Sequence, residues 1–427
     1  MSTKHAIAAA RFLENKENEA WHDHTLWMVR TKRDKMSHSL PEWERLRELA
    51  SEIKLYSNSH LDTLLEEFEK NAIANGAIVH WAKDAEEHNE IVLRILRQHD
   101  ARNLIKSKSM LTEECHMNEF LMSKGIDVVE SDLGERILQL MHLAPSHIVM
   151  PAIHIKREQI SEMMEREMGT EKGNIDPTYL THAARKNLRE KFLHADVAMT
   201  GANFAVASTG EIVVCTNEGN ADMGTSFPKV HIATMGMEKI VPNLEALGVF
   251  TRLLARSGTG QPITSYTSHY RRPREGGEYH IIIVDNGRSA LLSKPDHIKT
   301  LNCIRCGACL NVCPVYRQIG GHAYGSIYPG PIGSVLSPVL GGYEQYGDLP
   351  YTSTLCGACT ETCPVKIPLH ELLIEHRKVM EDGLSMHHDG SFVNFEMNTI
   401  GKGTSSPALF GMAINMAHTG LNMLPKA

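Results

Sequence analysis

The sequence lacks any long hydrophobic run, and this absence narrows the classes of protein to consider. No stretch of its 427 residues reaches 18 consecutive apolar residues, so no membrane-spanning helix is expected. Residues 1–20 contain no apolar core of the length that a secretory signal peptide needs. Lysine and arginine form no concentrated stripe, and with a net charge of −7 no nucleic-acid partner is expected. We therefore expect a cytoplasmic protein of two or three domains.

The sequence also lacks a Gly-x-Gly-x-x-Gly motif that opens a helix after a strand. Gly258-Thr259-Gly260 is too short for that motif, so no nicotinamide cofactor in a dinucleotide-binding fold is expected. Cysteine is scarce outside one region, because seven of the nine cysteines lie within 61 residues. In the cytosol such close spacing favours metal or redox chemistry over disulfides. The other two, Cys115 and Cys215, are expected to be ordinary buried thiols.

The seven clustered cysteines form two runs of related spacing. The first run is Cys303-x2-Cys306-x2-Cys309-x3-Cys313-Pro314, and the second is Cys356-x2-Cys359-x3-Cys363-Pro364. In bacterial ferredoxins the first three cysteines of such a run hold one cluster, and the fourth holds the other cluster. The spacing therefore predicts two iron–sulfur clusters with crossed ligands. The first would be held by Cys303, Cys306, Cys309 and Cys363, and the second by Cys313, Cys356 and Cys359.

The second set of cysteines is one ligand short. Alignment of Cys306-Gly307-Ala308-Cys309 with Cys356-Gly357-Ala358-Cys359 places Ser353 opposite Cys303. The second cluster then has three irons and acts as an electron relay, or it has four irons with a ligand other than cysteine. That ligand is Ser353, water or a substrate atom, and an open iron can act as a Lewis acid. Two structural zinc sites are a further interpretation, but zinc ribbons use paired Cys-x2-Cys hooks without this three-plus-one order.

Before the cysteines, strand-like and helix-like segments alternate. Apolar strand-like runs lie at 77–81, 103–106, 128–130 and 148–152, and the helical patterns that follow them lie at 85–98, 112–123, 133–142 and 156–168. This alternation predicts a parallel sheet covered by helices. Further strands are expected at 197–200, 204–208, 212–215, 230–235, 263–267 and 279–284. The last of these is expected to be a buried central strand.

These patterns divide the chain into four segments. We expect an N-terminal helical region (1–70), an α/β domain (71–295), a two-cluster iron–sulfur domain (296–385) and a C-terminal tail with an amphipathic helix (386–427). The long gap between Cys313 and Cys356 favours the α-helical, ferredoxin-like type of two-cluster domain. In the tail, an apolar stripe that is either core or a partner-docking face consists of Leu409, Met412, Ala413, Met416, Leu421 and Leu424.

Several polar residues near predicted strand ends are candidates for substrate binding. Lys108 follows the strand at 103–106, and ligands of open α/β sheets bind at the carboxyl ends of strands. It can hold an anionic group there; the alternative is that the segment serves only to cap the next helix, through Ser109 or Thr112. The loop after the strand at 212–215 can present N–H groups to a carboxylate, or it can be only a turn. Its candidate residues are Asn217, Glu218 and Asn220, and Lys229 is a further candidate anion contact.

His147 and His154 are candidate proton acceptors. A histidine that is neutral near pH 7 is suited to take a hydroxyl proton from a substrate. The two flank the strand expected at 148–152, and a separation of seven residues puts them on opposite faces of a straight strand. A shared metal site is therefore not expected unless Pro151 breaks the strand. Otherwise both are polar residues at the ends of a strand.

With these motifs the chain resembles lactate utilization protein B, an iron–sulfur family of bacterial lactate oxidation. The resemblance covers roughly residues 40–400. It rests on the cysteine runs together with Ser131-Asp132-Leu133-Gly134-Glu135, the segment PSHIVMPAIH at 145–154, Gly201-Ala202-Asn203-Phe204-Ala205, Asn217-Glu218-Gly219-Asn220 and the segment PKVHIA at 228–233. It implies an α/β domain of the lactate-utilization type and an electron-transferring subunit of a cytoplasmic complex that oxidises L-lactate to pyruvate. The complex can meet the membrane peripherally through its electron acceptor.

The resemblance also implies two partner subunits, one similar to a heterodisulfide reductase and one with a related α/β domain. Two alternatives remain open. In one, the chain is a relay or scaffold, and the substrate is bound wholly on a partner. In the other, the substrate is another 2-hydroxy acid such as glycolate, because Ala221-Asp222 stand where the family often has Gly and Arg. The sequence also ends, at Ala427, earlier than the family pattern.

Overall fold

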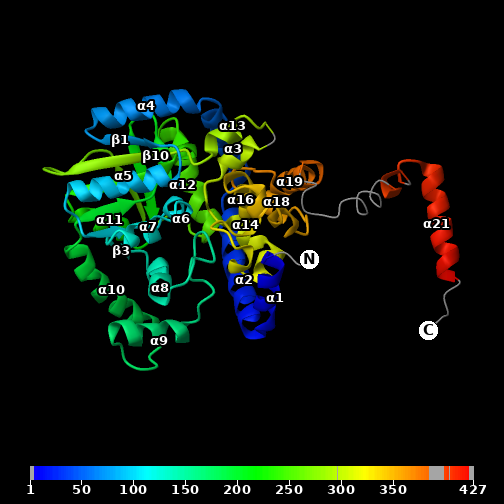
Figure 1. Cartoon of the computed structure of the whole chain (residues 1–427), viewed down its shortest axis with the longest axis horizontal. Helices are drawn as coiled ribbons and strands as arrows, with labels where there is room; N and C mark the ends of the chain where they lie inside the picture. The colour runs from blue at the N-terminus through cyan, green and yellow to red at the C-terminus, as the bar shows by residue number, and fades with distance from the viewer. Residues whose placement is uncertain (1–3, 296, 384–398, 403, 423–427) are drawn as a thin grey trace. The chain divides into compact units, whose positions relative to one another are not determined.

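The centre of the molecule is a parallel β-sheet, as the alternating sequence pattern predicts. The computed structural model describes residues 4–295, 297–383, 399–402 and 404–422, which fall into two compact units, Met1–His376 and Arg377–Ala427. In the first unit six strands lie in the order β1-β10-β7-β4-β2-β3, and every neighbouring pair is parallel (Figure 1). The strands are β1 (Ile78–Ala82), β2 (Asn103–Lys106), β3 (Asp127–Glu130), β4 (Val197–Thr200), β7 (Val230–Gly236) and β10 (Glu278–Val284).

Helices cover both faces of this sheet, which explains why β10 is apolar almost throughout. Along β10, Ile282 and Val284 pack into a core with α5 (Ala85–Gln98), whereas Ile281 and Ile283 pack on the opposite side with α4 (Leu61–Ala74). The first face is also covered by α6 (Met110–Glu114) and α7 (Met117–Ser123). The second face is also covered by α10 (Pro177–Leu193), beyond which α8 (Leu133–Met141) and α9 (Arg157–Met168) share a smaller core with it.

A second sheet packs against the α4 side of the first. Its strand order is β8-β5-β6-β9, with bounds β5 (Phe204–Val206), β6 (Glu211–Thr216), β8 (Ile240–Val241) and β9 (Tyr266–Tyr270). The turn between β5 and β6 needs Gly210, which has a φ of +67° and where an added Cβ would lie 2.3 Å from the backbone nitrogen of Ala72. On the outer face, Phe250 of α12 (Leu244–Gly258) stacks on Phe204 with 5.2 Å between ring centroids.

Three details of the α/β part differ from the sequence-based expectation. Residues 148–152 form turns and no strand, because prolines at 145 and 151 frame the segment and Ile148 packs into the core shared with the cysteines. The helix expected over 112–123 is divided into α6 and α7, because His116 takes a left-handed conformation with φ 49°. The strand expected at 263–267 begins three residues later, as β9.

The cysteine region is helical, in agreement with the predicted fold class. Among its described residues, 297–383, there is no strand. The short helices α14 (Ala308–Val312) and α18 (Ala358–Thr362) lie within the two cysteine runs. Between the runs lie α15 (Pro314–Ile319), α16 (Gly330–Leu340) and α17 (Tyr343–Tyr346), whereas α13 (Arg288–Leu292) precedes the region and α19 (Leu369–Gly383) follows the second run.

The N-terminal helices α1 (Lys4–Glu14), α2 (Lys16–His38) and α3 (Trp43–Ser59) pack against this cysteine region. Arg33 of α2 donates a hydrogen bond to the carbonyl of Thr362 at 3.0 Å. Arg47 of α3 donates to the carbonyls of Cys363 at 3.1 Å and Glu361 at 2.5 Å. Both arginines are buried, and their charge-assisted hydrogen bonds hold the backbone at the end of the second cysteine run. The start of the chain therefore fixes a segment more than 300 residues away in sequence.

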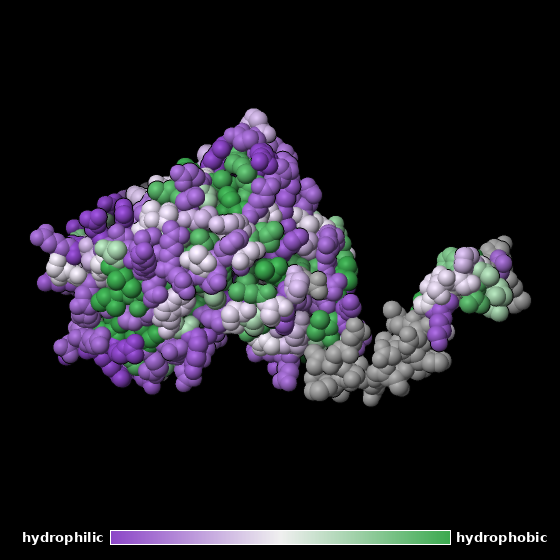
Figure 2. All heavy atoms as spheres, turned by 90° about the horizontal axis from the view of Figure 1, so that it is seen from above, coloured by the Kyte–Doolittle hydropathy of each residue, from purple (hydrophilic) through white to green (hydrophobic). Residues whose placement is uncertain are grey.

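The surface of the first unit is largely hydrophilic on the face that Figure 2 shows, where smaller hydrophobic areas are separated by polar residues. None of the described helices is both long and apolar enough to cross a membrane. In the second unit, α21 (Pro407–Asn422) carries the apolar stripe noted in the sequence, and Leu409, Met412 and Met416 are exposed. Leu424 lies outside the described residues.

Candidate functional site

A cavity of about 500 Å³ lies at the carboxyl edge of the six-stranded sheet. One wall consists of residues that follow the parallel strands, among them Lys108 after β2 and Asn203 after β4. The other wall includes Arg305 and Cys306 of the first cysteine run. Ligands of open α/β sheets bind at this edge. The structure therefore places the expected ligand site of the α/β part directly beside the cysteine region.

Three buried polar atoms of the cavity wall have no hydrogen-bond partner among the described residues: Lys108 Nζ, Ser107 Oγ and Thr216 Oγ1. Lys108 Nζ lies 3.6 Å from Glu135 Oε1, which is an ion pair but too long for a hydrogen bond. Buried polar groups in folded proteins nearly always have a partner. These atoms therefore mark a place where a polar ligand completes the site, and the ammonium of Lys108 suits a negatively charged one.

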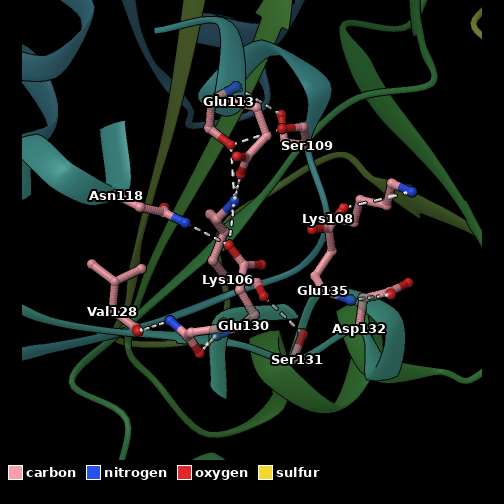
Figure 3. Close-up of polar contacts among 12 residues, drawn as sticks. Lys106, Lys108, Ser109, Glu113, Asn118, Val128, Glu130, Ser131, Asp132 and Glu135 are labelled. Carbon is pink, nitrogen blue, oxygen red and sulfur yellow. Dashed lines mark hydrogen bonds and ion pairs between the residues drawn. The ribbon is translucent and has the colours of Figure 1, made fainter. Parts of the chain in front are cut away.

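Next to Lys108 in the sequence, Lys106 forms a buried ion network with Glu130 and Glu113 (Figure 3). Lys106 Nζ, at the end of β2, lies 2.7 Å from Glu130 Oε1 and 3.1 Å from Glu113 Oε1, and it donates a hydrogen bond to Thr112 Oγ1 at 3.0 Å. Despite full burial, these carboxylates hold the pKa of Lys106 above its ordinary value. Burial raises the pKa of Glu135 to about 7, against the opposing effect of Lys108. Lys106 thus pairs with Glu130 and Glu113, whereas Lys108 has the longer ion pair with Glu135 and lines the cavity.

The loop residues predicted from the sequence also reach this cavity, because Asn217, Glu218 and Asn220 all line it. Asn217 Nδ2 donates to Gln261 Oε1 at 3.0 Å, and Asn220 Nδ2 donates to Ser131 Oγ at 3.3 Å. Burial raises the pKa of Glu218, and the neighbouring Asp132 raises it further. These contacts fix the loop in place between β6 and α11 (Asn220–Ser226).

Two further residues of the sequence analysis lie away from the cavity. Lys229 is exposed at the amino end of β7, opposite to the carboxyl edge that forms the cavity. Asp222 is not a lining residue, and its Oδ1 accepts hydrogen bonds from Ser268 Oγ at 2.5 Å and from the hydroxyl of Tyr270 at 3.4 Å. Asp222, one of the two residues that depart from the family pattern, therefore contacts side chains of β9 and does not line the cavity.

The structure does not bring His147 or His154 to the cavity lining. His147 is buried, its Nδ1 accepts hydrogen bonds from the N–H groups of Val149 and Met150, and its Nε2 donates to Asn311 Oδ1 at 3.0 Å. Both ring nitrogens are thus used inside the protein, and burial lowers the pKa of His147 to about 3. His154 Nδ1 lies 2.7 Å from Ser146 Oγ. Neither has the geometry of a residue that takes a proton from a ligand in the cavity.

The sequence analysis missed a second buried charge network, which joins the sheet to the first cysteine run. Arg288, after β10, pairs with both carboxylate oxygens of Glu114 at 2.8 and 2.9 Å and with Glu238 Oε2 at 2.6 Å. Arg305, between Cys303 and Cys306, lies 3.3 Å from Glu238 Oε1. Although burial opposes ionisation, these arginines hold the pKa of Glu238 down to about 2. An arginine inside a cysteine run was the one signal in the sequence that pointed to this contact.

The structure brings cysteines of the two runs together. A small cavity is lined by four cysteines from both runs, namely Cys303, Cys306, Cys309 and Cys363. Burial raises the pKa of Cys306, and the neighbouring Cys363 raises it further. Burial and the neighbouring Cys313 raise the pKa of Cys359 to about 12. Cys363 therefore lies with the first set, and Cys313 lies with the second.

These residues fit iron–sulfur clusters. All nine cysteines are free thiols, and six of the seven clustered ones are buried, Cys356 being exposed. Thiols gathered from two distant segments, four of them lining one small cavity, are the donor set that an iron–sulfur cluster requires. The half-buried Cys215 also lines the large cavity, whereas Cys115 lies in the core beside α5.

The two cysteine runs have the same local backbone. Arg305 and Leu355, each directly before a cysteine, both take left-handed conformations with φ 60° and 54°, and Gly307 and Gly357 do so two residues later. The N–H of Arg305 donates to Cys303 Sγ at 3.4 Å, and the N–H of Leu355 donates to Ser353 Oγ at 3.1 Å. Ser353 Oγ thus has the position in the second run that Cys303 Sγ has in the first.

Comparison with known sequences agrees with this division of the chain. Residues 65–288 match the LUD domain family, and residues 299–367 match the 4Fe-4S dicluster domain family. Lactate utilization protein B of Bacillus pumilus is 48% identical over 394 residues, which is 91% of this chain and 82% of that protein. Lactate utilization protein B of Geobacillus thermodenitrificans is 48% identical over 388 residues, 88% of this chain and 80% of that protein.

The fold and the cysteine set together define an iron–sulfur protein built on a LUD domain. Nearly half of all positions are shared with relatives over nine tenths of the chain. The chain therefore belongs to the lactate utilization protein B family. A crystal structure of a DUF162 family protein from Deinococcus radiodurans is also similar, with 16% identity, a TM-score of 0.29, and coverage of 52% of this chain and 98% of that one.

The buried ion network behind Lys108 generates a stability prediction. Lys106→Met should destabilise the protein by about 3–5 kcal/mol, because it leaves the buried carboxylate of Glu130 without its cation. The double variant Lys106→Met/Glu130→Gln should recover at least half of that loss, because both charges are then absent. Thermal unfolding followed by circular dichroism measures both. A double variant less stable than the single one would contradict the assignment.

Proposed function

We propose that this chain is the electron-transferring iron–sulfur subunit of a cytoplasmic complex that oxidises L-lactate to pyruvate. Its relatives are named for lactate utilization, and its residues 299–367 match a domain that carries 4Fe-4S clusters. The oxidation releases two electrons and two protons, and clusters held by thiolates supply one-electron acceptance when bound. The observation that carries the proposal is one cavity lined by both Lys108 and Cys306.

The cavity residues suit a small 2-hydroxy carboxylate. Lys108 supplies a buried ammonium without a hydrogen-bond partner among the described residues, which can form a charge-assisted hydrogen bond to the carboxylate. Asn217, Glu218 and Asn220 offer amide and carboxyl groups to the hydroxyl and carboxylate oxygens from the neighbouring wall. Arg305, beside Cys306 on the other wall, is paired with Glu238, so Lys108 is the cation on which the binding of an anion rests. The site thus favours a bound anion close to the first cysteine set.

The positions of Lys108 and Asp222 bear on the two alternative functions. A relay or scaffold without its own substrate site would have no use for a buried, under-coordinated lysine in a cavity, so the geometry favours a substrate site. Oxidation of another 2-hydroxy acid such as glycolate was suggested by Ala221-Asp222. Because Asp222 bonds to Ser268 and Tyr270 outside the cavity lining, that suggestion has no structural support.

The proposal includes two partners and a division of the chain. The partners are two other lactate-utilization subunits, one similar to a heterodisulfide reductase and one with a related α/β domain. Within this chain, residues 71–295 would form the substrate-binding domain and residues 296–385 the cluster domain. The N-terminal region 1–70 would support the cluster domain through Arg33 and Arg47. Residues 386–427 would form a separate C-terminal tail segment.

Lactate binding tests the substrate site. Calorimetric titration of the cluster-loaded full chain should show saturable binding of L-lactate, weakened by about tenfold or more in Lys108→Met, because a charge-assisted hydrogen bond contributes about 1.5–3 kcal/mol. Lys229→Met is the matched control, because this exposed lysine lies at the opposite edge of the sheet. Equal binding by Lys108→Met and wild type would refute the site. No binding by an iron-replete wild type would support the relay function, and tighter binding of glycolate would identify the other acid.

The cysteine sets are proposed to be crossed: Cys303, Cys306, Cys309 and Cys363 hold one 4Fe-4S cluster, and Cys313, Cys356 and Cys359 hold the second. Cys306→Ser should abolish the first cluster and spare the second, whereas Cys313→Ser should do the reverse. Electron paramagnetic resonance of anaerobically purified, reduced protein, with iron counting, distinguishes the two. If Cys313→Ser removes the signal that Cys306→Ser also removes, each run closes on its own cluster and the crossing is wrong.

Ser353 is proposed as the fourth ligand of the second cluster, because its Oγ occupies the position that Cys303 Sγ has in the first run. The anaerobic wild-type chain should then contain eight irons. Ser353→Ala should contain seven and show a three-iron signal, and Ser353→Cys should restore eight, because a thiolate fills the same corner. Seven irons in wild type and in all variants would show that the second cluster is a three-iron relay.

A further inference from the structure

A second group of metal-ligating side chains lies at the amino edge of the six-stranded sheet, opposite to the cavity. His99 follows the last turn of α5, and Glu278 and His280 begin β10. One potential ligand atom from each of these three residues lies within 4.8 Å of the other two. His99 Nε2 and His280 Nε2 are each 3.2 Å from the same oxygen, Glu278 Oε2.

The spacing of these atoms fits a bound metal ion. Zinc bonds to histidine nitrogen and carboxylate oxygen at about 2.0–2.2 Å, so two tetrahedral ligands lie about 3.3–3.5 Å apart. The observed 3.2 Å separations are close to this value, whereas they are at the long limit for an N–H···O hydrogen bond. Two imidazole nitrogens that converge on one carboxylate oxygen are thus better spaced for a shared cation than for two hydrogen bonds.

His80 of β1 completes the arrangement from behind. Its Nε2 lies 3.0 Å from His280 Nδ1, and the two rings stack with 5.3 Å between centroids. When His280 donates Nδ1–H to His80, its Nε2 carries the lone pair that faces Glu278. Metal-bound histidines nearly always bond through their second nitrogen in this way.

The group is also accessible to an ion from solvent. The side chain of His280 is 4% exposed, whereas those of His99 and Glu278 are 28% and 47% exposed. The buried histidine fixes the position of the site, and the other two leave a path for entry. No described residue of the two cysteine runs is part of this group, so its chemistry is independent of the clusters.

We propose that His99, Glu278 and His280 bind one divalent transition-metal ion of the zinc type, with His80 orienting His280. Three protein ligands leave a fourth position for water. The ion would join the end of α5 to the start of β10, and so fasten the helix to the sheet at the edge away from the cavity. The site does not depend on the proposed lactate function, because it uses none of the cavity residues.

Zinc binding by the full chain, with its clusters intact, tests the proposal. Equilibrium dialysis against Zn²⁺ followed by elemental analysis should give one zinc per chain in wild type, and iron measured in the same samples shows whether zinc has displaced iron at the cysteines. His99→Ala and Glu278→Gln should each weaken zinc binding by about tenfold or more. Both residues are partly exposed, so these variants should fold. Zinc should raise the melting temperature of wild type and not that of either variant.

His194→Ala is the matched control. His194 is exposed, its Nδ1 lies 3.7 Å from Glu190 Oε2, and no third metal-ligating side chain joins this pair among the described residues. This variant should bind zinc as wild type does. Equal zinc binding by wild type, His99→Ala and Glu278→Gln would overturn the proposal, and so would a wild-type chain with intact clusters that binds no zinc. In either case the three side chains form only a hydrogen-bonded cluster.

Discussion

The whole arrangement depends on a chain of buried charges that joins the parallel sheet to the first cysteine run. Glu114, Arg288, Glu238 and Arg305 form this chain in order, and Arg305 lies between two cluster cysteines. Charges this deeply buried are tolerated only when each has close partners, so the contact has little freedom of position. The network therefore sets the distance between the carboxyl edge of the sheet and the cysteines, and it encloses the cavity between them.

The cysteine region holds thiols from distant segments of the chain together. Left-handed conformations recur at matching places in both runs, and Gly307 packs so tightly on His147 that an added Cβ would lie 2.9 Å from the ring. His147 therefore supports the cysteine loop. The helices α2 and α3 close the region from outside through Arg33 and Arg47. One body thus contains the α/β sheet, the cysteines and the N-terminal helices.

The sequence predicted those features that depend on local pattern. The limits of α5 and β2, the buried β10 and the pairing of the cysteine runs follow from periodicity and spacing, and the carboxyl-edge rule correctly brought Lys108 to a cavity. Features that depend on tertiary contact were not predictable. His147 was considered a base because its two backbone donors and Asn311 are invisible in sequence. By contrast, Lys229 directly precedes the strand predicted at 230–235, so the carboxyl-edge rule already placed it at the opposite edge from Lys108.

The central claim is that the substrate binds in the cavity lined by Cys306, next to the first cysteine set, and magnetic coupling tests it most directly. Electron–nuclear double resonance on the reduced first cluster, with ¹³C-labelled L-lactate bound to the full chain, should show a ¹³C coupling that disappears in unlabelled lactate and is lost in Lys108→Met. Saturable lactate binding with no ¹³C coupling to that cluster would contradict the account, because the substrate would then lie elsewhere.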